Sequence, residues 1–111
     1  MLLMTKEIEK KLPALHSQEE KAPGEVPIVV KFFDPTGSWT WYVTEGEKEE
    51  NGDFLFFGLV YSGVGGFEKE FGYFKLSELQ GAKQSLVGLK GLPIERDMHF
   101  TGTLADVMAG A

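Results

Sequence analysis

The residues best suited to chemistry lie together in the segment Glu95-Arg96-Asp97-Met98-His99. A carboxylate beside a histidine can orient the imidazole ring and tune its pKa, which is the start of acid–base chemistry. The same segment also suits a structural role, in which Arg96, the only arginine, ties down a loop through a carboxylate. No nucleophile motif accompanies it, because the stretch YSGVGG lacks the spacing of G-x-S-x-G. We therefore predict no catalytic residue and keep Arg96, Asp97 and His99 as binding candidates.

A second candidate is the aromatic stretch Trp-Thr-Trp-Tyr-Val-Thr at residues 39–44. Residues two apart share one face of a strand, so Trp39 and Trp41 would project together and offer a platform for a base, a sugar or a partner side chain. In the alternative interpretation this face packs against helices, since aromatic residues in strands are commonly core. We predict Trp39, Trp41 and Tyr42 as binding residues, and complete burial of both indoles would exclude the platform.

Acidic residues gather at 45–53, in the stretch EGEKEENGD. Carboxylate oxygens suit calcium, but the spacing does not fit an EF-hand loop: if Glu47 were the first ligand, the twelfth position would be Gly58 rather than Glu. A solvated hairpin tip, or carboxylates that imitate nucleic-acid phosphates, are the remaining interpretations. Glu45 is kept as a binding candidate. His16 and His99 are far apart in the sequence, and we expect neither a metal nor a cofactor.

Composition narrows the class of protein. The chain has 111 residues, 17 acidic and 11 basic, for a net charge of −6, and it has no cysteine. This length favours a single domain over residues 1–111. The absence of cysteine excludes a disulfide scaffold and a thiolate zinc site, and the acidic balance argues against direct nucleic-acid binding. No apolar run approaches the roughly 20 residues of a membrane span, so we expect a cytoplasmic protein with no membrane contact.

The elements that must position these residues follow from the periodicity of apolar residues and from the capping and turn-forming residues between them. Thr5 is placed to cap a helix over 6–12, and a polar loop follows over 16–27. Alternating or continuous apolar runs predict strands at residues 28–33, 38–45, 54–61 and 67–76. Short links between the strands indicate an antiparallel meander, because parallel pairs need long crossovers.

The C-terminal third is less regular. Ser77 is expected to cap a helical turn, and Thr103 with Asp106 is expected to cap a short helix up to residue 108. The segment 92–100 fits either a helical turn that begins at Pro93 or a short edge strand. The predicted fold class is α+β, a four-stranded antiparallel meander with short terminal helices, or the same sheet curled into a small open barrel. An uncovered edge strand would allow a homodimer.

Four ordered motifs carry a resemblance that covers most of the chain: VKFFDPTGSWTWYVTEG at 30–46, LFFGLV at 55–60, FGYFKLSEL at 71–79 and GLPIERDMHF at 91–100. The sequence resembles a family of short bacterial proteins with a domain of unknown function, often encoded on plasmids and other mobile elements. The resemblance implies a bacterial or phage-like genetic setting. It implies no activity and no catalytic residues.

Three functional hypotheses follow. The first is a non-enzymatic interaction module of a bacterial mobile element, which presents Trp and Tyr side chains to a protein partner. The second is an acidic inhibitor that mimics nucleic acid and blocks a host defence system; an electrostatic mimic must bind more weakly as salt rises. The third is a small hydrolase or transferase that uses the segment 95–99, which requires a cleft holding Arg96, Asp97 and His99 with perturbed pKa values.

Overall fold

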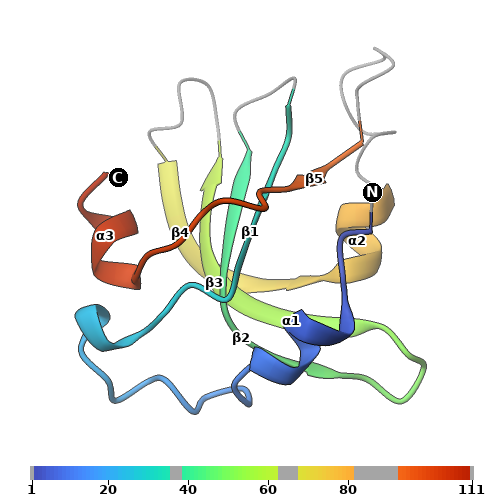
Figure 1. Ribbon diagram of the computed structural model, residues 1–111, viewed down its shortest axis with the longest axis horizontal. Coiled ribbons are helices and arrows are strands. Elements are labelled where there is room, and N and C mark those ends of the chain that lie inside the picture. The colour runs from blue at the N-terminus through green and yellow to red at the C-terminus, as the bar shows by residue number, and fades with distance from the viewer. Residues whose placement is uncertain (1, 36–38, 63–67, 82–92, 111) are drawn as a thin grey trace.

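An open antiparallel sheet of five strands, in the order β4-β3-β2-β1-β5, forms the centre of the protein (Figure 1). The structure is a computed structural model that describes residues 2–35, 39–62, 68–81 and 93–110. Short helices lie near both ends of the chain, so the predicted α+β class is confirmed. The elements are α1 Lys6–Lys11, η1 Pro23–Glu25, β1 Val30–Phe33, β2 Thr40–Lys48, β3 Phe54–Ser62, β4 Glu68–Lys75, α2 Leu76–Gly81, β5 Glu95–Arg96 and α3 Leu104–Met108.

The first four strands form the predicted meander, and the apolar stretch β3 is central, between β2 and β4. The strand count was wrong by one. Residues Glu95–Arg96 form β5, which pairs with Phe32 and Phe33 of β1, so the edge-strand alternative for this segment is the correct one. Because β4 and β5 end the sheet on opposite sides, it is open rather than a closed barrel. The residues Asp34-Pro35-Thr36-Gly37 predict a turn between β1 and β2, and part of this turn lies outside the described residues.

Two of the three helix caps predicted from the sequence are present in the structure. The Thr5 hydroxyl accepts the Ile8 backbone N–H at 3.2 Å, and Thr103 with Asp106 forms a capping box at the start of α3. The prediction for Ser77 was wrong, because α2 already begins at Leu76. The Ser77 hydroxyl instead donates to the Asp53 carboxylate at 2.6 Å and ties α2 to the β2–β3 hairpin.

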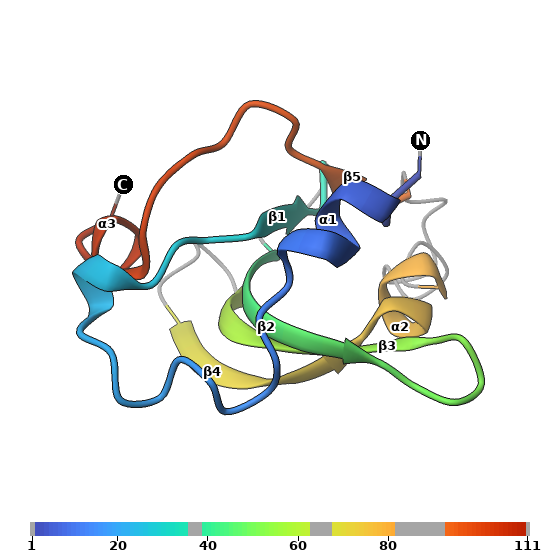
Figure 2. The same ribbon diagram turned by 60° about the horizontal axis from the view of Figure 1, so that its bottom comes forward.

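The sheet buries apolar side chains on both faces. Figure 2 shows α1 and α2 toward one side of the view and α3 toward the other. One face, which we call the α1 face, carries the larger cluster; it includes Phe32, Phe56 and Phe74 and is covered by α1, α2 and the N-terminal segment. The opposite α3 face carries a smaller cluster around Tyr42 and Leu59, which contact Val107 of α3. The α3 face is only partly covered, and large apolar side chains of β4 stay exposed there.

A β-bulge in β2 sets the geometry of the α3 face. The pairing of β2 with β3 shifts by one residue between Val43 and Glu45, so that Glu45 lies opposite Phe57. The strand backbones approach closely just before the bulge, where a Cβ atom on Gly58 would lie 1.8 Å from the Tyr42 carbonyl oxygen. Only glycine fits there without movement of the backbone. The bulge turns the side chain of Glu45 toward the α3 face.

Candidate functional site

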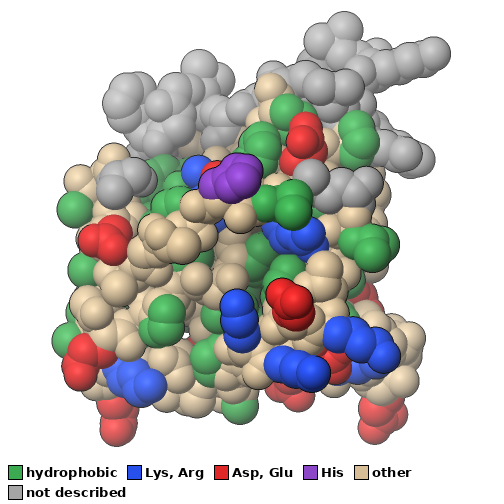
Figure 3. Space-filling view, in the orientation of Figure 1, with side chains coloured by type: hydrophobic (Ala, Val, Ile, Leu, Met, Phe, Trp, Pro, Cys, Tyr) green, Lys and Arg blue, Asp and Glu red, His purple; other side chains and the backbone are tan. Residues whose placement is uncertain are grey.

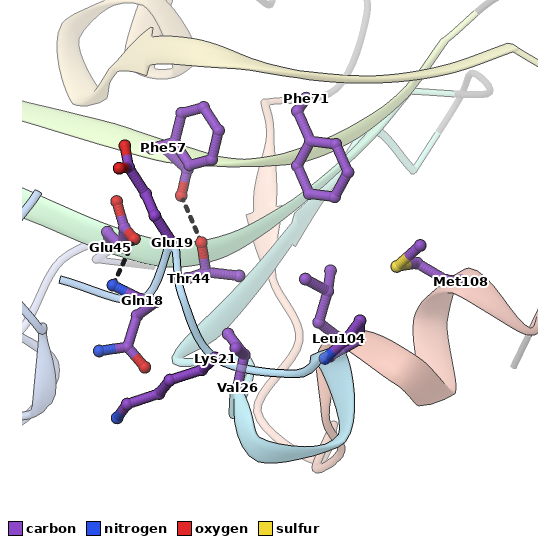
Figure 4. Close-up of a pocket in the computed structure, with 11 residues that line it drawn as sticks. Gln18, Glu19, Lys21, Val26, Thr44, Glu45, Phe57, Phe71, Leu104 and Met108 are labelled. Carbon is purple, nitrogen blue, oxygen red and sulfur yellow. Dashed lines mark hydrogen bonds between the residues drawn. The ribbon is translucent and has the colours of Figure 1, made fainter. Parts of the chain in front are cut away.

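A pocket of about 440 Å³ opens on the α3 face, between the segment that precedes β1 and the middle of strands β2 to β4 (Figure 4). Its floor is formed by Thr44, Glu45 and Phe57, and Phe71 of β4 stands over one side. The remaining lining residues come from the loop and from the C-terminal helix: Gln18, Glu19, Lys21, Pro23, Val26, Leu104 and Met108. The pocket thus combines an apolar wall with a polar floor, as small binding sites commonly do.

Glu45 holds the loop that forms one wall. Glu45 is only 3% exposed. Its two carboxylate oxygens accept hydrogen bonds from the backbone N–H groups of His16, at 2.8 Å, and Gln18, at 2.9 Å. His16 has φ +70°, and this left-handed turn is the kind of backbone that aims nearby N–H groups at one anion. A buried carboxylate is costly unless charge-assisted bonds compensate it, so Glu45 and the loop fix each other's position.

Aromatic side chains extend the pocket wall across β3 and β4. Phe57 stacks on Phe71 with ring centroids 6.0 Å apart and contacts Tyr73 at 5.0 Å. Phe71 is 47% exposed and Tyr73 is 52% exposed, which is high for large apolar residues. His16 meets the edge of Tyr73 at 6.3 Å. This apolar row continues from the pocket to the outer edge of the sheet.

The rim of the pocket carries charge of both signs. Glu19 accepts a hydrogen bond from His16 Nδ1, and this bond, with the negative charge of Glu19, raises the pKa of His16 above its usual 6.5. Lys21 also lines the pocket. In the floor, Thr44 Oγ1 donates to the Phe57 carbonyl at 3.2 Å, so its proton is already committed. The arrangement suits insertion of an apolar side chain more than bond breaking.

The aromatic stretch is divided between the two faces. Trp39 and Trp41 do stack, with centroids 5.8 Å apart and planes 21° apart, but Trp41 is 8% exposed whereas Trp39 is 43% exposed. Tyr42 lies in the core of the α3 face, where contacts with Tyr61 and Phe100 bury it, and burial raises the pKa of its hydroxyl. The three residues therefore do not share one open surface, and Trp39 is the member that reaches solvent.

Charged side chains of the segment 95–99 form hydrogen bonds with backbone atoms. Arg96 Nη1 donates to the Leu2 carbonyl at 2.7 Å, and Asp97 accepts the backbone N–H of His99 at 2.9 Å. That bond, together with Lys31 at 3.7 Å, lowers the pKa of Asp97. Arg96 and Asp97 border a groove of about 560 Å³ beside α1, while His99 is exposed. In Figure 3, Lys and Arg side chains gather over α1, which borders this groove.

Several acidic side chains of the stretch 45–53 form hydrogen bonds or ion pairs within the protein. Glu45 lies in the pocket floor, Glu49 pairs with Lys75 at 3.4 Å, and Asp53 accepts bonds from Phe54 and Ser77. Among the residues that the structure describes, no three His, Asp or Glu side chains are placed to hold a metal ion. Within the same ranges, no helix has the length and apolar character needed to cross a membrane.

Of the residues predicted from sequence, only Glu45 lies at this pocket; Trp39, Arg96, Asp97 and His99 lie elsewhere on the surface. Phe57 and Phe71 were not predicted as site residues. For Phe71 a signal was present in the strand periodicity of 67–76, which places Phe71 and Tyr73 on one side. Periodicity does not reveal that these two side chains stay exposed.

Comparison with protein families finds a match over residues 3–107 to the family model described as Protein of unknown function (DUF2958). Comparison with curated proteins and with solved structures finds no match. The match covers every lining residue of the pocket except Met108.

Proposed function

The chain belongs to the DUF2958 family of proteins of unknown function, and from this premise we propose that it is a non-enzymatic module that binds a protein partner through the Glu45 pocket. The observation that carries this proposal is the exposure of Phe71 and Tyr73 beside an apolar pocket of about 440 Å³. Exposed aromatic residues at the rim of a pocket are typical anchors of protein interfaces.

The setting that we propose for this partner is a bacterial cell that carries a plasmid or other mobile element, and it rests on the resemblance of the four sequence motifs. The alternatives have less support. Nucleic-acid mimicry needs free carboxylates, and Glu45, Glu49 and Asp53 are engaged in internal contacts. A hydrolase or transferase at residues 95–99 needs free side chains, and both Arg96 and Asp97 bind backbone atoms.

Selection of random peptides displayed on phage tests the proposal, because it requires no assumption about the identity of the partner. We expect the protein to enrich peptides with large apolar residues, and we expect Phe71→Ser to abolish their capture. Trp39→Ser is the matched control, because it removes an exposed aromatic residue from another part of the surface. Peptides that bind equally well to Phe71→Ser, or a selection without enrichment, would overturn the proposal.

A further inference from the structure

We propose that the outer edge of β4 is a strand-addition site, at which the partner binds as an extended, antiparallel segment with apolar side chains at alternate positions and a net positive charge. This inference rests on the proposed function and specifies its partner. It starts from the position of β4, an eight-residue strand that ends the sheet and that, within the described ranges, pairs with β3 alone. An exposed strand edge offers unpaired N–H and C=O groups to another chain.

Two hydrogen bonds identify which β4 residues face outward. The first is on β4 itself: the Lys75 N–H donates to Glu78 Oε1 at 2.8 Å, so Lys75 does not use this group to bond β3. Along an antiparallel strand, each residue directs both its N–H and its C=O to one side, and this side alternates from one residue to the next. Residues two apart therefore direct these groups to the same side. Tyr73, Phe71 and Lys69 therefore present their N–H and C=O groups to the open edge.

The second bond, in the β2–β3 pair, gives the same result independently. The Gly46 N–H donates to the Pro13 carbonyl at 2.9 Å, away from β3. The next pair, Glu47 with Leu55, must then be hydrogen-bonded, so Leu55 directs its backbone groups toward β2. Lys75, which lies opposite Leu55 on β4, is left to face outward. Among the described residues, no backbone–backbone bond of a turn, loop or cap reaches residues 69–73 of β4.

Phe71 joins this edge to the pocket. Its backbone groups face outward, and its side chain lines the pocket on the α3 face. An antiparallel strand added about 4.8 Å from β4 would place its hydrogen-bonded residues opposite Phe71 and Tyr73, with their side chains on the same face. Alternate apolar residues of the partner would thus lie along the row of Phe57, Phe71 and Tyr73 and beside the pocket.

Charge favours a cationic peptide over a second copy of this chain. Each copy carries −6, and a dimer would bring these charges together. The two-fold register that pairs Phe71 with Tyr73 of the second copy also places Lys69 opposite Lys75, and like charges directly opposite are unfavourable. A segment that alternates apolar residues with lysine avoids both conflicts and can approach the exposed Glu70 of β4.

The test uses a ten-residue peptide that alternates lysine and valine, with blocked ends, and measures binding to the full-length chain by fluorescence anisotropy. Two further peptides are N-methylated, one at every valine and the other at every lysine. We expect methylation at valine to weaken binding by about ten-fold or more, because those N–H groups face β4, and methylation at lysine to have little effect. Equal effects of the two methylation patterns, or no binding of the unmethylated peptide, would overturn strand addition.

A pair of protein variants separates the backbone from the side chain. Tyr73→Ala removes the ring and keeps the outward N–H, whereas Tyr73→Pro removes both without loss of a bond to β3. We expect Tyr73→Pro to bind the peptide about ten-fold more weakly than Tyr73→Ala, with circular dichroism and thermal unfolding as controls for folding. Equal binding of the two folded variants would contradict strand addition.

Phage-selected peptides that still require Phe71 would then leave the pocket proposal intact. A dimer seen by analytical ultracentrifugation would assign the edge of β4 to a second copy of the chain instead.

Discussion

Glu45 is the residue whose environment says most about this site. Its carboxylate is removed from solvent and satisfied by two backbone N–H groups of a loop that lies 27 and 29 residues earlier in the chain. Such bonds position the loop and, with it, one wall of the pocket. We therefore expect substitution of the Glu45 carboxylate to change both the order of the loop and the stability of the whole protein.

Replacing Glu45 with Gln is expected to destabilise the protein by about 1–3 kcal/mol, because an amide N–H₂ then faces one of the two backbone donors. Urea unfolding measures the free energy, and hydrogen exchange at the His16 and Gln18 amides measures the order of the loop. Glu47→Gln is the matched control; it changes an exposed acid two residues away and is expected to shift stability by less than about 0.5 kcal/mol. Equal effects of the two substitutions would show that the buried bonds contribute nothing specific.

The second residue-scale prediction concerns His16. Its contact with Glu19 raises its pKa, so the ion pair stabilises the fold below the unfolded pKa of about 6.5, and this contribution is lost as pH rises through the higher folded value. An NMR titration of the His16 ring is expected to give a pKa above 6.5. Glu19→Gln is expected to lower it toward that value. A His16 pKa that is the same in both proteins would refute the assignment to Glu19.

At the scale of the elements, the close approach of β2 and β3 depends on a glycine. A Cβ atom at Gly58 would overlap the Tyr42 carbonyl oxygen, so Gly58→Ala is expected to destabilise the protein by about 3 kcal/mol or more. Gly72 lies directly opposite Gly58 on β4, and a Cβ atom added there would have open space for 4 Å around it. Gly72→Ala is expected to be neutral or to stabilise by up to about 1 kcal/mol. Thermal or chemical unfolding of both variants compares them, and similar losses at the two positions would contradict the close backbone approach at Gly58.

At the scale of the whole molecule, the sheet has both faces at least partly covered and β4 at one end. Hydrogen exchange monitored by NMR can show whether that edge is open. The amides of Glu70, Gly72 and Phe74 face β3 and are expected to exchange more slowly than those of Lys69, Phe71 and Tyr73, by about ten-fold or more. Uniform protection along the strand would mean that another segment covers the edge.

Local features of the sequence determined most of the elements. The caps at Thr5 and Thr103 depend on side chains within three residues of the helix start, and the four main strands depend on apolar periodicity and short links. Interactions of this kind need no knowledge of distant parts of the chain. The bulge shows the limit, because a register shift between Val43 and Glu45 depends on how β2 fits β3.

Only the tertiary structure decided which residues form the site. The sequence placed Trp39 and Trp41 on one face and an acid at position 45, but burial depends on segments that are far away in the chain. The N-terminal segment and α1 help to form the core in which Trp41 is buried, the loop near His16 and Gln18 encloses Glu45, and α3 covers Tyr42 while Phe71 stays exposed. Periodicity specifies on which side of a strand a side chain lies, whereas packing between distant segments determines whether that side meets solvent.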